Sequence, residues 1–244
     1  MRAERCRGAG VMCVAAASRA ELFFVRETAH MYASIVTPHV AAEGPAGTAW
    51  VRGILNGAAE AGDVVHRVVS PLRCRASRRD RDTWGADQEG DDGFVVVHKS
   101  KDVGTSFKCL VLAQRADLRS LRDVRGVHLP MLRAMRDALA TLIGSGRFGA
   151  DVRWDTVRVY FHYPPLTYHL HVHATHHRVA RGVHVERAHL LDDVIDALGR
   201  DGEHFAVAAI TYLLPEGPLL EGLRAAAVGG EGVRAVAASG GLDA

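Results

Sequence analysis

The chain has 244 residues, of which 48% are hydrophobic and 24% are charged, a balance typical of a soluble globular protein with one large or two small domains. Its formal net charge of +2, with histidine neutral, argues against a general attraction to nucleic acid but allows a local anion site. No apolar run is long enough to cross a membrane, and the four cysteines form no CxxC pair, which disfavours zinc ribbons, thioredoxin-like proteins and disulfide scaffolds.

The N-terminal region is expected to contain a tail and then a helix. Residues 1–20 are rich in arginine and then in small apolar residues, which is typical of an N-terminal tail or, alternatively, of a targeting peptide. Ser18 and Glu21 match a capping box, and the apolar residues that follow are spaced as on one face of a helix. We therefore assign residues 21–60 to a helix and a linker. The apolar residues in question are Leu22, Val25 and Ala29.

Residues 61–225 carry the patterns of one mixed domain. Runs of β-branched and apolar residues predict strands, and apolar residues at helical spacing predict helices. Because strands come first and long helices interrupt them, we predict an α+β fold with a mainly antiparallel sheet and flanking helices. Strands are expected at 64–69, 93–99, 107–115, 157–163 and 168–175, helices at 128–146 and 185–200, and either a strand or a buried helix at 204–214.

Two segments are expected to lie outside the packed core. Residues 75–92 are charged and nearly devoid of aliphatic side chains, which predicts a solvated loop, with an RNA contact through its basic half as the alternative. Residues 226–244 are rich in glycine and alanine, and we interpret them as a C-terminal tail.

Histidines occupy alternate positions in the stretch YHLHVHATHH. On a strand, successive side chains point to opposite faces, so His169, His171 and His173 share one face while the apolar residues between them share the other. His162 lies on the preceding predicted strand and would add a fourth imidazole across the connection.

Three interpretations fit such a row of imidazoles. The histidines could bind zinc, although no Asp or Glu lies between Asp155 and Glu186 to complete a catalytic zinc site. They could perform nucleophilic catalysis at phosphorus, where one neutral imidazole attacks and its neighbours donate hydrogen bonds to phosphoryl oxygens. They could also form a polar strand face that merely contacts water.

The segment HLHVHAT follows the pattern His-φ-His-φ-His-φ-φ, where φ is small or apolar, and thereby resembles the histidine triad (HIT) superfamily of nucleotidyl hydrolases and transferases. Further blocks, in order along roughly residues 20–225, resemble one family within it, the scavenger mRNA decapping enzymes, which are m7GpppX diphosphatases. These blocks are VRETAHMYASIVTPHV with WVRGILNGAAEA, LRSLRDV with HLPMLRAM, HYPPLTYHLHVH, and GVHVERAHLLDDVIDAL.

This resemblance implies a HIT-like fold and a defined reaction. The cap dinucleotide m7GpppN, or a short capped oligonucleotide, would be hydrolysed to m7GMP and a nucleoside or oligonucleotide diphosphate, through a phosphohistidine and without a cofactor or metal. His171 corresponds to the nucleophile, and His169, His173 and His162 would orient it and bind phosphate. The resemblance also implies a homodimer acting on capped RNA fragments in the cytoplasm, the nucleus or both, with no membrane association.

Four further residues match binding positions of that family. Two of them, Trp50 and Glu60, lie in the 21–60 segment and make its linker the part expected to contact the cap. Trp50 corresponds to the tryptophan that stacks on 7-methylguanine, whose positive charge attracts an aromatic face. Glu60 corresponds to the carboxylate that accepts guanine N–H groups. Lys101 and Arg187 correspond to phosphate-binding positions and would offset the charge of the triphosphate.

The sequence departs from the family pattern on both sides of the proposed base site. Lys99 and Ser100 stand where the family has an acidic residue and a leucine. Ser100 removes part of the wall beside the base, and Lys99 brings a positive charge near a cationic base unless it turns toward phosphate. Leu166 and Thr167 replace the family's serine and first tyrosine. We expect these departures to weaken methyl-cap selectivity more than hydrolysis.

A further departure concerns the front of the chain, where the family's long domain-swapped N-terminal lid is expected to be missing or reduced. An open or differently gated site with weaker discrimination by RNA length would follow. Three alternatives to a cap hydrolase stay open: a general HIT hydrolase of dinucleoside polyphosphates, a cap-binding protein without catalysis, and a zinc hydrolase.

Overall fold

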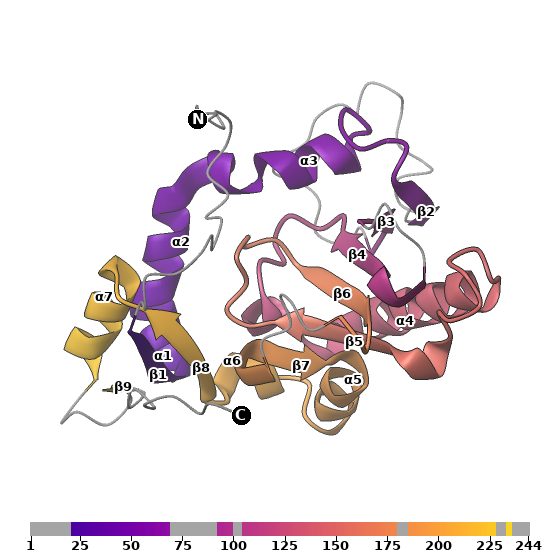
Figure 1. The fold of residues 1–244 in the computed structure, drawn as a ribbon. Helices are drawn as coiled ribbons and strands as arrows, with labels where there is room; N and C mark the ends of the chain where they lie inside the picture. The colour runs from indigo at the N-terminus through magenta and orange to yellow at the C-terminus, as the bar shows by residue number, and fades with distance from the viewer. Residues whose placement is uncertain (1–20, 69–91, 100–103, 180–184, 228–232, 236–244) are drawn as a thin grey trace, which may run out of the picture.

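The computed structural model shows a six-stranded and a three-stranded sheet, both antiparallel, connected by a helical arm (Figure 1). The predicted α+β class with an antiparallel sheet and flanking helices is therefore confirmed. No helix in the described part of the chain has the length and apolar character needed to span a bilayer. The structure describes residues 21–68, 92–99, 104–179, 185–227 and 233–235.

The six-stranded sheet carries the histidine-rich strand in its interior. Strand β6 lies between β4 and β5 and pairs with both, so its hydrogen-bonding edges are engaged on either side. The position of every side chain on β6 is thus set by two independent registers. In spatial order the strands are β2 (Val64–Val68), β3 (Phe94–His98), β4 (Lys108–Ala113), β6 (His171–His176), β5 (Val157–His162) and β7 (Ala188–Leu190).

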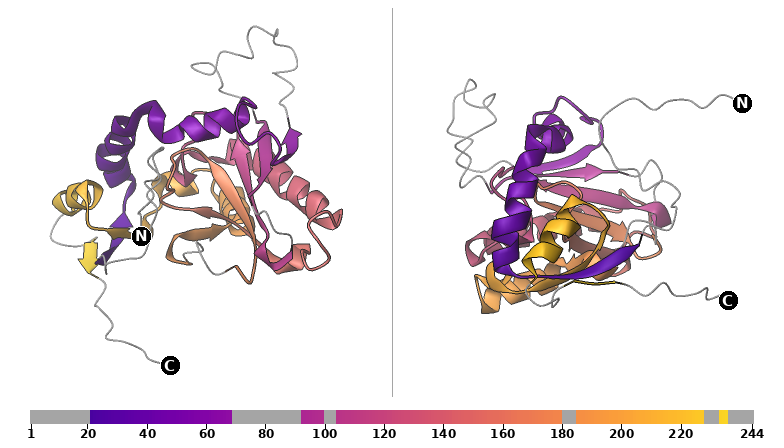
Figure 2. Two further views of the ribbon diagram at one scale, coloured as in Figure 1. Left: turned by 45° about the horizontal axis from the view of Figure 1, so that its top comes forward. Right: turned by 90° about the vertical axis from the view of Figure 1, so that its left-hand side faces the viewer.

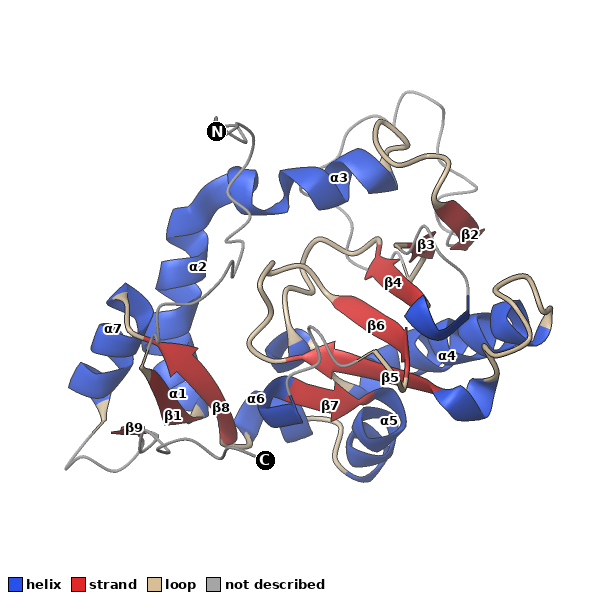
Figure 3. Ribbon diagram, in the orientation of Figure 1, coloured by secondary structure: helices blue, strands red, loops and turns tan. Residues whose placement is uncertain are grey.

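One face of this sheet packs against two long helices, α4 (Leu129–Gly144) and α5 (Leu191–Arg200) (Figure 3). Helix α4 forms as predicted, with Pro130 in its first turn and a buried apolar stripe that joins the apolar side chains of β6 in one cluster. The stripe consists of Met131, Leu132, Met135, Leu139 and Ile143, and the β6 side chains are Val172 and Ala174.

The opposite face of the sheet packs against α3 (Ala49–Leu55). Val51 and Ile54 of this helix form a second buried cluster with Val97 and Leu112. Leu112 is directly opposite His171 in the β4–β6 register, and residues opposite each other point to the same side. The histidine face of β6 therefore looks toward the side of the sheet that α3 covers.

The smaller sheet joins the two ends of the described chain. Strand β1 (Leu22–Glu27) lies between β8 (Ile210–Pro215) and β9 (Val233–Ala235). Helix α7 (Pro218–Ala226) packs beside the helical arm, as Figure 2 shows in its right-hand view. A Cβ at Gly222 would lie only 2.9 Å from Cγ2 of Ile35, so this contact needs glycine.

The helical arm runs from the small sheet to β2 and consists of short helical pieces in succession. These are α1 (Ala29–Met31), a π-helical turn (Tyr32–Val36), α2 (Thr37–Glu43), a 3₁₀ turn (Gly44–Thr48) and α3. Elsewhere, α6 (His204–Val207) precedes β8, and 3₁₀ turns occupy Gly104–Ser106, Leu121–Asp123, Gly126–His128, Trp154–Thr156 and Val185–Arg187.

Two predicted elements differ from the structure. The helix predicted to follow Ser18 is wrong at Leu22–Glu27, which forms β1: alternate residues of this segment are buried, and β8 supplies a partner strand. Thr28 caps the first helix instead, accepting a hydrogen bond from the Met31 amide at 3.3 Å. The helix predicted at 185–200 begins only at Leu191, because residues 188–190 pair with β5.

Other predicted boundaries shift or lie out of view. The strand predicted at 168–175 begins at His171, and the ambiguous segment 204–214 contains both α6 and part of β8. The charged loop predicted at 75–92 lies outside the described residues except for Asp92, whose carboxylate is 3.5 Å from the Arg115 guanidinium. The predicted division into domains stays a prediction. The pairing of β1 with β8 joins the predicted segment 21–60 to the predicted domain 61–225.

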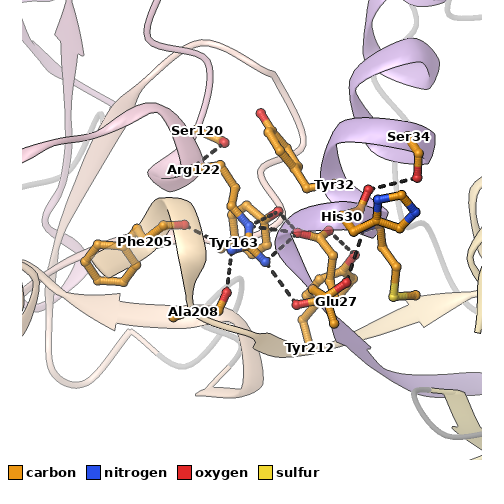
Figure 4. Close-up of polar contacts among 12 residues, drawn as sticks. Glu27, His30, Tyr32, Ser34, Ser120, Arg122, Tyr163, Phe205, Ala208 and Tyr212 are labelled. Carbon is orange, nitrogen blue, oxygen red and sulfur yellow. Dashed lines mark hydrogen bonds and ion pairs between the residues drawn. The ribbon is translucent and has the colours of Figure 1, made fainter. Parts of the chain in front are cut away.

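A buried carboxylate, that of Glu27 on β1, joins the two sheets (Figure 4). It accepts hydrogen bonds from the Arg122 guanidinium at 2.9 Å and from the hydroxyl groups of Tyr163 and Tyr212. Burial raises the pKa of both phenols above the usual tyrosine value, so they remain protonated donors. Arg122 also donates to the carbonyl oxygen of Phe205 at 3.0 Å, which ties α6 to the same centre.

Replacing Arg122 with methionine should destabilise the fold strongly, because the Glu27 carboxylate would stay buried without its cationic partner. The expected loss is about 3–5 kcal/mol in the free energy of unfolding, measured by urea denaturation. Arg153→Met is the matched control, because its pair with Asp155 is exposed to solvent and should contribute almost nothing. Equal losses in the two variants would contradict the prediction.

Candidate active site

Three imidazoles cluster on the α3-facing side of the sheet. The ring centroid of His173 is 5.0 Å from that of His171 and 4.5 Å from that of His162. Tyr160, which is opposite His173 in the β5–β6 register, stacks on it at 5.2 Å with only 13° between the ring planes. The predicted fourth imidazole across the connection is thus in place, and the stacked tyrosine holds the middle ring of the cluster.

Hydrogen bonds to backbone carbonyls fix the tautomers of two histidines. The Nδ1 atom of His171 is 2.7 Å from the carbonyl oxygen of His169, and the Nε2 atom of His169 is 2.7 Å from the carbonyl oxygen of Ala113. A carbonyl oxygen only accepts, so each of these nitrogens carries the proton in the neutral ring. The Nε2 atom of His171 is consequently left with its lone pair.

Burial keeps His169, His171 and His173 uncharged. It lowers the pKa of the His171 imidazole from its ordinary value near 6.5 and lowers that of His169 to about 4. For His173, burial together with the nearby His171, His162 and Arg187 lowers the pKa to about 2. The Nε2 atom of His173 is also buried and has no hydrogen-bond partner among the described residues. At neutral pH these three rings are therefore neutral, as nucleophilic attack by an imidazole requires.

Arg187 brings the positive charge of the cluster. It stands in the 3₁₀ turn before β7, and its guanidinium donates to the carbonyl oxygen of Pro164. Its own carbonyl oxygen accepts from the Tyr163 amide at 2.8 Å. Burial lowers the pKa of the guanidinium from its ordinary value, but the group remains a cation at any physiological pH. The loop after β5 and the turn before β7 thus hold each other beside the histidines.

A second group of side chains gathers where α3, β3 and the loop before β6 meet. The indole Nε1 of Trp50 donates to the hydroxyl oxygen of Thr167 at 3.3 Å. The ammonium of Lys99 pairs with Glu60 and lies 5.9 Å from the centroid of the Trp50 ring. Glu60 has a φ of 50°, an uncommon left-handed conformation for a residue with a side chain. Thr167 is four residues from His171, so their Cα atoms are at most about 14 Å apart.

The structure thus brings most of the predicted site residues together in two neighbouring groups. His162, His171 and His173 form the first, with Arg187 and the buried His169 at its margin. Trp50 and Glu60 form the second. Lys101 lies outside the described residues, as does Ser100, so their predicted roles stay predictions.

Sequence reasoning missed two contributors. Tyr160 has a local signal in the sequence: it precedes His162 by two positions on the same strand, so the two side chains share a face. Thr167 was noted only as a departure from the family pattern, whereas its hydroxyl oxygen receives the Trp50 indole N–H. A hydrogen bond between residues 117 positions apart gives no local signal in the sequence.

Two further observations bear on the chemistry of this region. A cavity of about 630 Å³ lies at the β7 edge of the sheet, and Tyr160 is the one lining residue that also contacts the histidine cluster among the residues described. Its other lining residues come mostly from α5, α6 and β7. In the described part of the chain, no group of three or more His, Cys, Asp or Glu side chains is arranged to hold a metal ion, which gives the zinc interpretation no support.

Comparison with known proteins places these features in a family. The family described as "Scavenger mRNA decapping enzyme C-term binding" matches residues 50–189. Among curated proteins, the m7GpppX diphosphatase of Bos taurus is 34% identical over 208 residues, which is 83% of this chain and 55% of the relative. The corresponding protein of Homo sapiens is 33% identical over 214 residues, 85% of this chain and 56% of the relative. The corresponding protein of Schizosaccharomyces pombe is 29% identical over 197 residues, which is 79% of this chain and 58% of the relative. The chain spans about half the length of the curated relatives it matches.

The assigned tautomers can be tested by imidazole NMR. Long-range ¹H–¹⁵N spectra at pH 7 should show His171 protonated at Nδ1 and His169 protonated at Nε2, because each of these nitrogens donates to a carbonyl oxygen. The signals are assigned by their loss in His171→Asn and His169→Asn. A proton on Nε2 of His171 would contradict the geometry.

Acidification should destabilise the protein before its carboxylates titrate. The folded state holds His169 neutral with a pKa of about 4, whereas the unfolded chain takes up that proton near pH 6.5. Stability is therefore complete above pH 6.5 and falls as the pH drops toward 4, by about 1.4 kcal/mol per pH unit for one such histidine. Urea denaturation at pH 7, 6 and 5 should show a shallower slope in His169→Asn. An unchanged slope would contradict the prediction.

Proposed function

Because the chain belongs to the family of scavenger mRNA decapping enzymes, we propose that it hydrolyses capped ends of RNA. The substrate is the cap dinucleotide m7GpppN or a short capped oligonucleotide. The products are m7GMP and a nucleoside diphosphate, or an oligonucleotide with a 5′ diphosphate. The relatives named above carry the name m7GpppX diphosphatase, which supports this reaction for the present chain.

The observation that carries the proposal is the free lone pair on Nε2 of His171. Three histidines on one strand face can have many roles. In the neutral ring of His171, however, Nδ1 donates its proton to a backbone carbonyl oxygen, so Nε2 is the nitrogen that can attack phosphorus or accept a hydrogen bond. The lowered pKa of the ring keeps this lone pair available at neutral pH. Both features are what nucleophilic catalysis at phosphorus needs.

The reaction follows from this arrangement in two displacements. Nε2 of His171 forms a bond to the phosphorus nearest the methylguanosine, and the bond from that phosphorus to the bridging oxygen breaks. The electron pair leaves with the nucleoside diphosphate, which is a stable anion and needs little assistance. Water then attacks the phosphohistidine, releases m7GMP and restores the imidazole. Arg187 offsets the negative charge that both displacements concentrate near His173.

Recognition of the substrate is assigned to the second group of side chains. Trp50 is 38% exposed, and its indole N–H donates to Thr167, so the ring has a defined orientation. Glu60 offers the carboxylate for guanine N–H groups. Lys101 is assigned to the phosphates by resemblance. No cofactor or metal enters this proposal.

A second candidate is a general HIT hydrolase of dinucleoside polyphosphates. One observation favours it: Lys99 pairs with the Glu60 carboxylate, which lowers the negative charge available to a methylated base. Rates with m7GpppG and unmethylated GpppG distinguish the two functions. A clear preference for m7GpppG supports the cap hydrolase, and equal rates support the general enzyme.

We also propose that the protein acts as a homodimer in the cytoplasm, the nucleus or both, as the family resemblance implies. The mass of the purified protein by light scattering tests the first statement. Localisation of the full-length protein by fractionation of its own cells tests the second.

His171→Asn should abolish hydrolysis of m7GpppG, with a loss of at least about 1,000-fold in kcat, because the nucleophile is gone while the strand keeps its registers. Product formation is followed by anion-exchange chromatography. His177→Asn is the matched control, since it removes an exposed imidazole from the end of the same strand segment and should keep wild-type activity. Full activity in His171→Asn would remove the proposed function.

A further inference from the structure

The ammonium group of Lys99 occupies the aromatic–acidic site that Trp50 and Glu60 form. Its nitrogen pairs with Oε2 of Glu60 and lies 5.9 Å from the centroid of the Trp50 ring. An aromatic face and a carboxylate placed around one cation is a common way in which proteins recognise positively charged groups. The chain therefore fills this site with a cation of its own.

Backbone hydrogen bonds hold both charged residues in position. The Lys99 amide donates to the carbonyl oxygen of Lys108 at 2.8 Å, so the residue continues the pairing of β3 with β4. The His98 amide donates to the carbonyl oxygen of Asp63 at 2.8 Å, and the Asp63 amide donates to that of Glu60 at 2.9 Å. The end of β3 and the turn that presents Glu60 are thus tied to each other.

The Glu60 backbone adds a sign that this turn is specialised. Its φ of 50° lies in the left-handed region, where a residue with a side chain is strained by roughly 1 kcal/mol or more. The carboxylate is held toward Lys99 and Trp50 in spite of that cost. The side chains of Lys99 and Glu60 keep 31% and 35% of their exposure, so a ligand is able to displace the ammonium.

The sequence left two directions open for Lys99, toward phosphate or toward the base. In the structure it turns toward the base side, because its contacts are the ring and the carboxylate that the proposed function assigns to guanine. A positively charged base entering there meets a like charge and a carboxylate that is already neutralised. A neutral base has to displace the ammonium but is not repelled by it.

We propose that Lys99 is a specificity-determining residue that occupies the aromatic–acidic site from within the chain and selects against a positively charged base. This inference about Lys99 rests on the proposed function in one respect, namely that the ligand is a guanine nucleotide. Two unit charges about 6 Å apart in partly solvated surroundings change affinity by roughly tenfold. Lys99 should therefore lower the preference for 7-methylguanine over guanine by about that factor.

The experiment measures binding of 7-methyl-GMP and GMP to the purified full chain by isothermal titration calorimetry. Lys99→Met keeps the aliphatic stem and removes the charge, and it should raise the affinity ratio of 7-methyl-GMP to GMP about tenfold over wild type. Lys99→Arg keeps a cation at the site and should keep the ratio within about twofold of wild type. Arg153→Met removes an exposed positive charge elsewhere and should leave the ratio unchanged.

Three results would overturn the inference: an unchanged ratio in Lys99→Met, the same rise in Arg153→Met, or no binding of either nucleotide by Lys99→Met. Hydrolysis of m7GpppG by the same preparations separates this inference from the proposed function. Intact hydrolysis with an unshifted ratio removes the role of Lys99 alone. A shifted ratio without hydrolysis in the wild-type protein removes the proposed function and leaves the role of Lys99 standing.

Discussion

The buried carboxylate of Glu27 is the point on which the two sheets depend. It brings together a strand near the start of the described chain, the guanidinium of Arg122, and two tyrosines from distant segments. Because a buried charge needs every one of its partners, these segments cannot separate independently. One of the partners, Tyr163, directly follows His162 and shares a backbone hydrogen bond with Arg187. The same centre that joins the two sheets therefore also fixes the loop that borders the histidine cluster.

Within the large sheet, the placement of the imidazoles depends on strand register rather than on loops. His171 and His173 are opposite Leu112 and Leu110 of β4, and Tyr160 of β5 is opposite His173 on the other side. A shift of one residue in the pairing of β6 would turn the imidazoles toward α4 and α5 and would bring Val172 to the α3-facing side of the sheet. The apolar packing of Val172 and Ala174 against the helices therefore sets the direction of the His171 imidazole, the proposed nucleophile.

The parts of this arrangement that sequence predicted are those with a local signal. The alternation around His171 gave the strand, its two faces and the helix-packed core, and the apolar spacing after Pro130 gave α4. The Glu27–Arg122 pair could not be predicted, since its members are 95 positions apart and each alone looks like a surface residue. The strand at Leu22–Glu27 was missed because its apolar residues fit a helical period as well as an alternating one, and only the presence of β8 decides between them.

The two halves of the site differ in what they require from the chain. The imidazole of His171, the proposed nucleophile, is positioned by a single strand in register and by the carbonyl oxygen of His169, two residues away on the same segment. The proposed base site combines Trp50 and Glu60, from α3 and the turn that follows it, with Thr167 and Lys99 from two distant segments, and these three segments meet only in the fold. The departures from the family pattern at Lys99 and Thr167 therefore change charge and contacts around Trp50 and Glu60 without touching the hydrogen bond that fixes the His171 tautomer. In the proposed function, substrate selectivity and nucleophilic attack are therefore physically separable, because the contacts of Lys99 and Thr167 share no atom with the hydrogen bond that fixes the His171 tautomer.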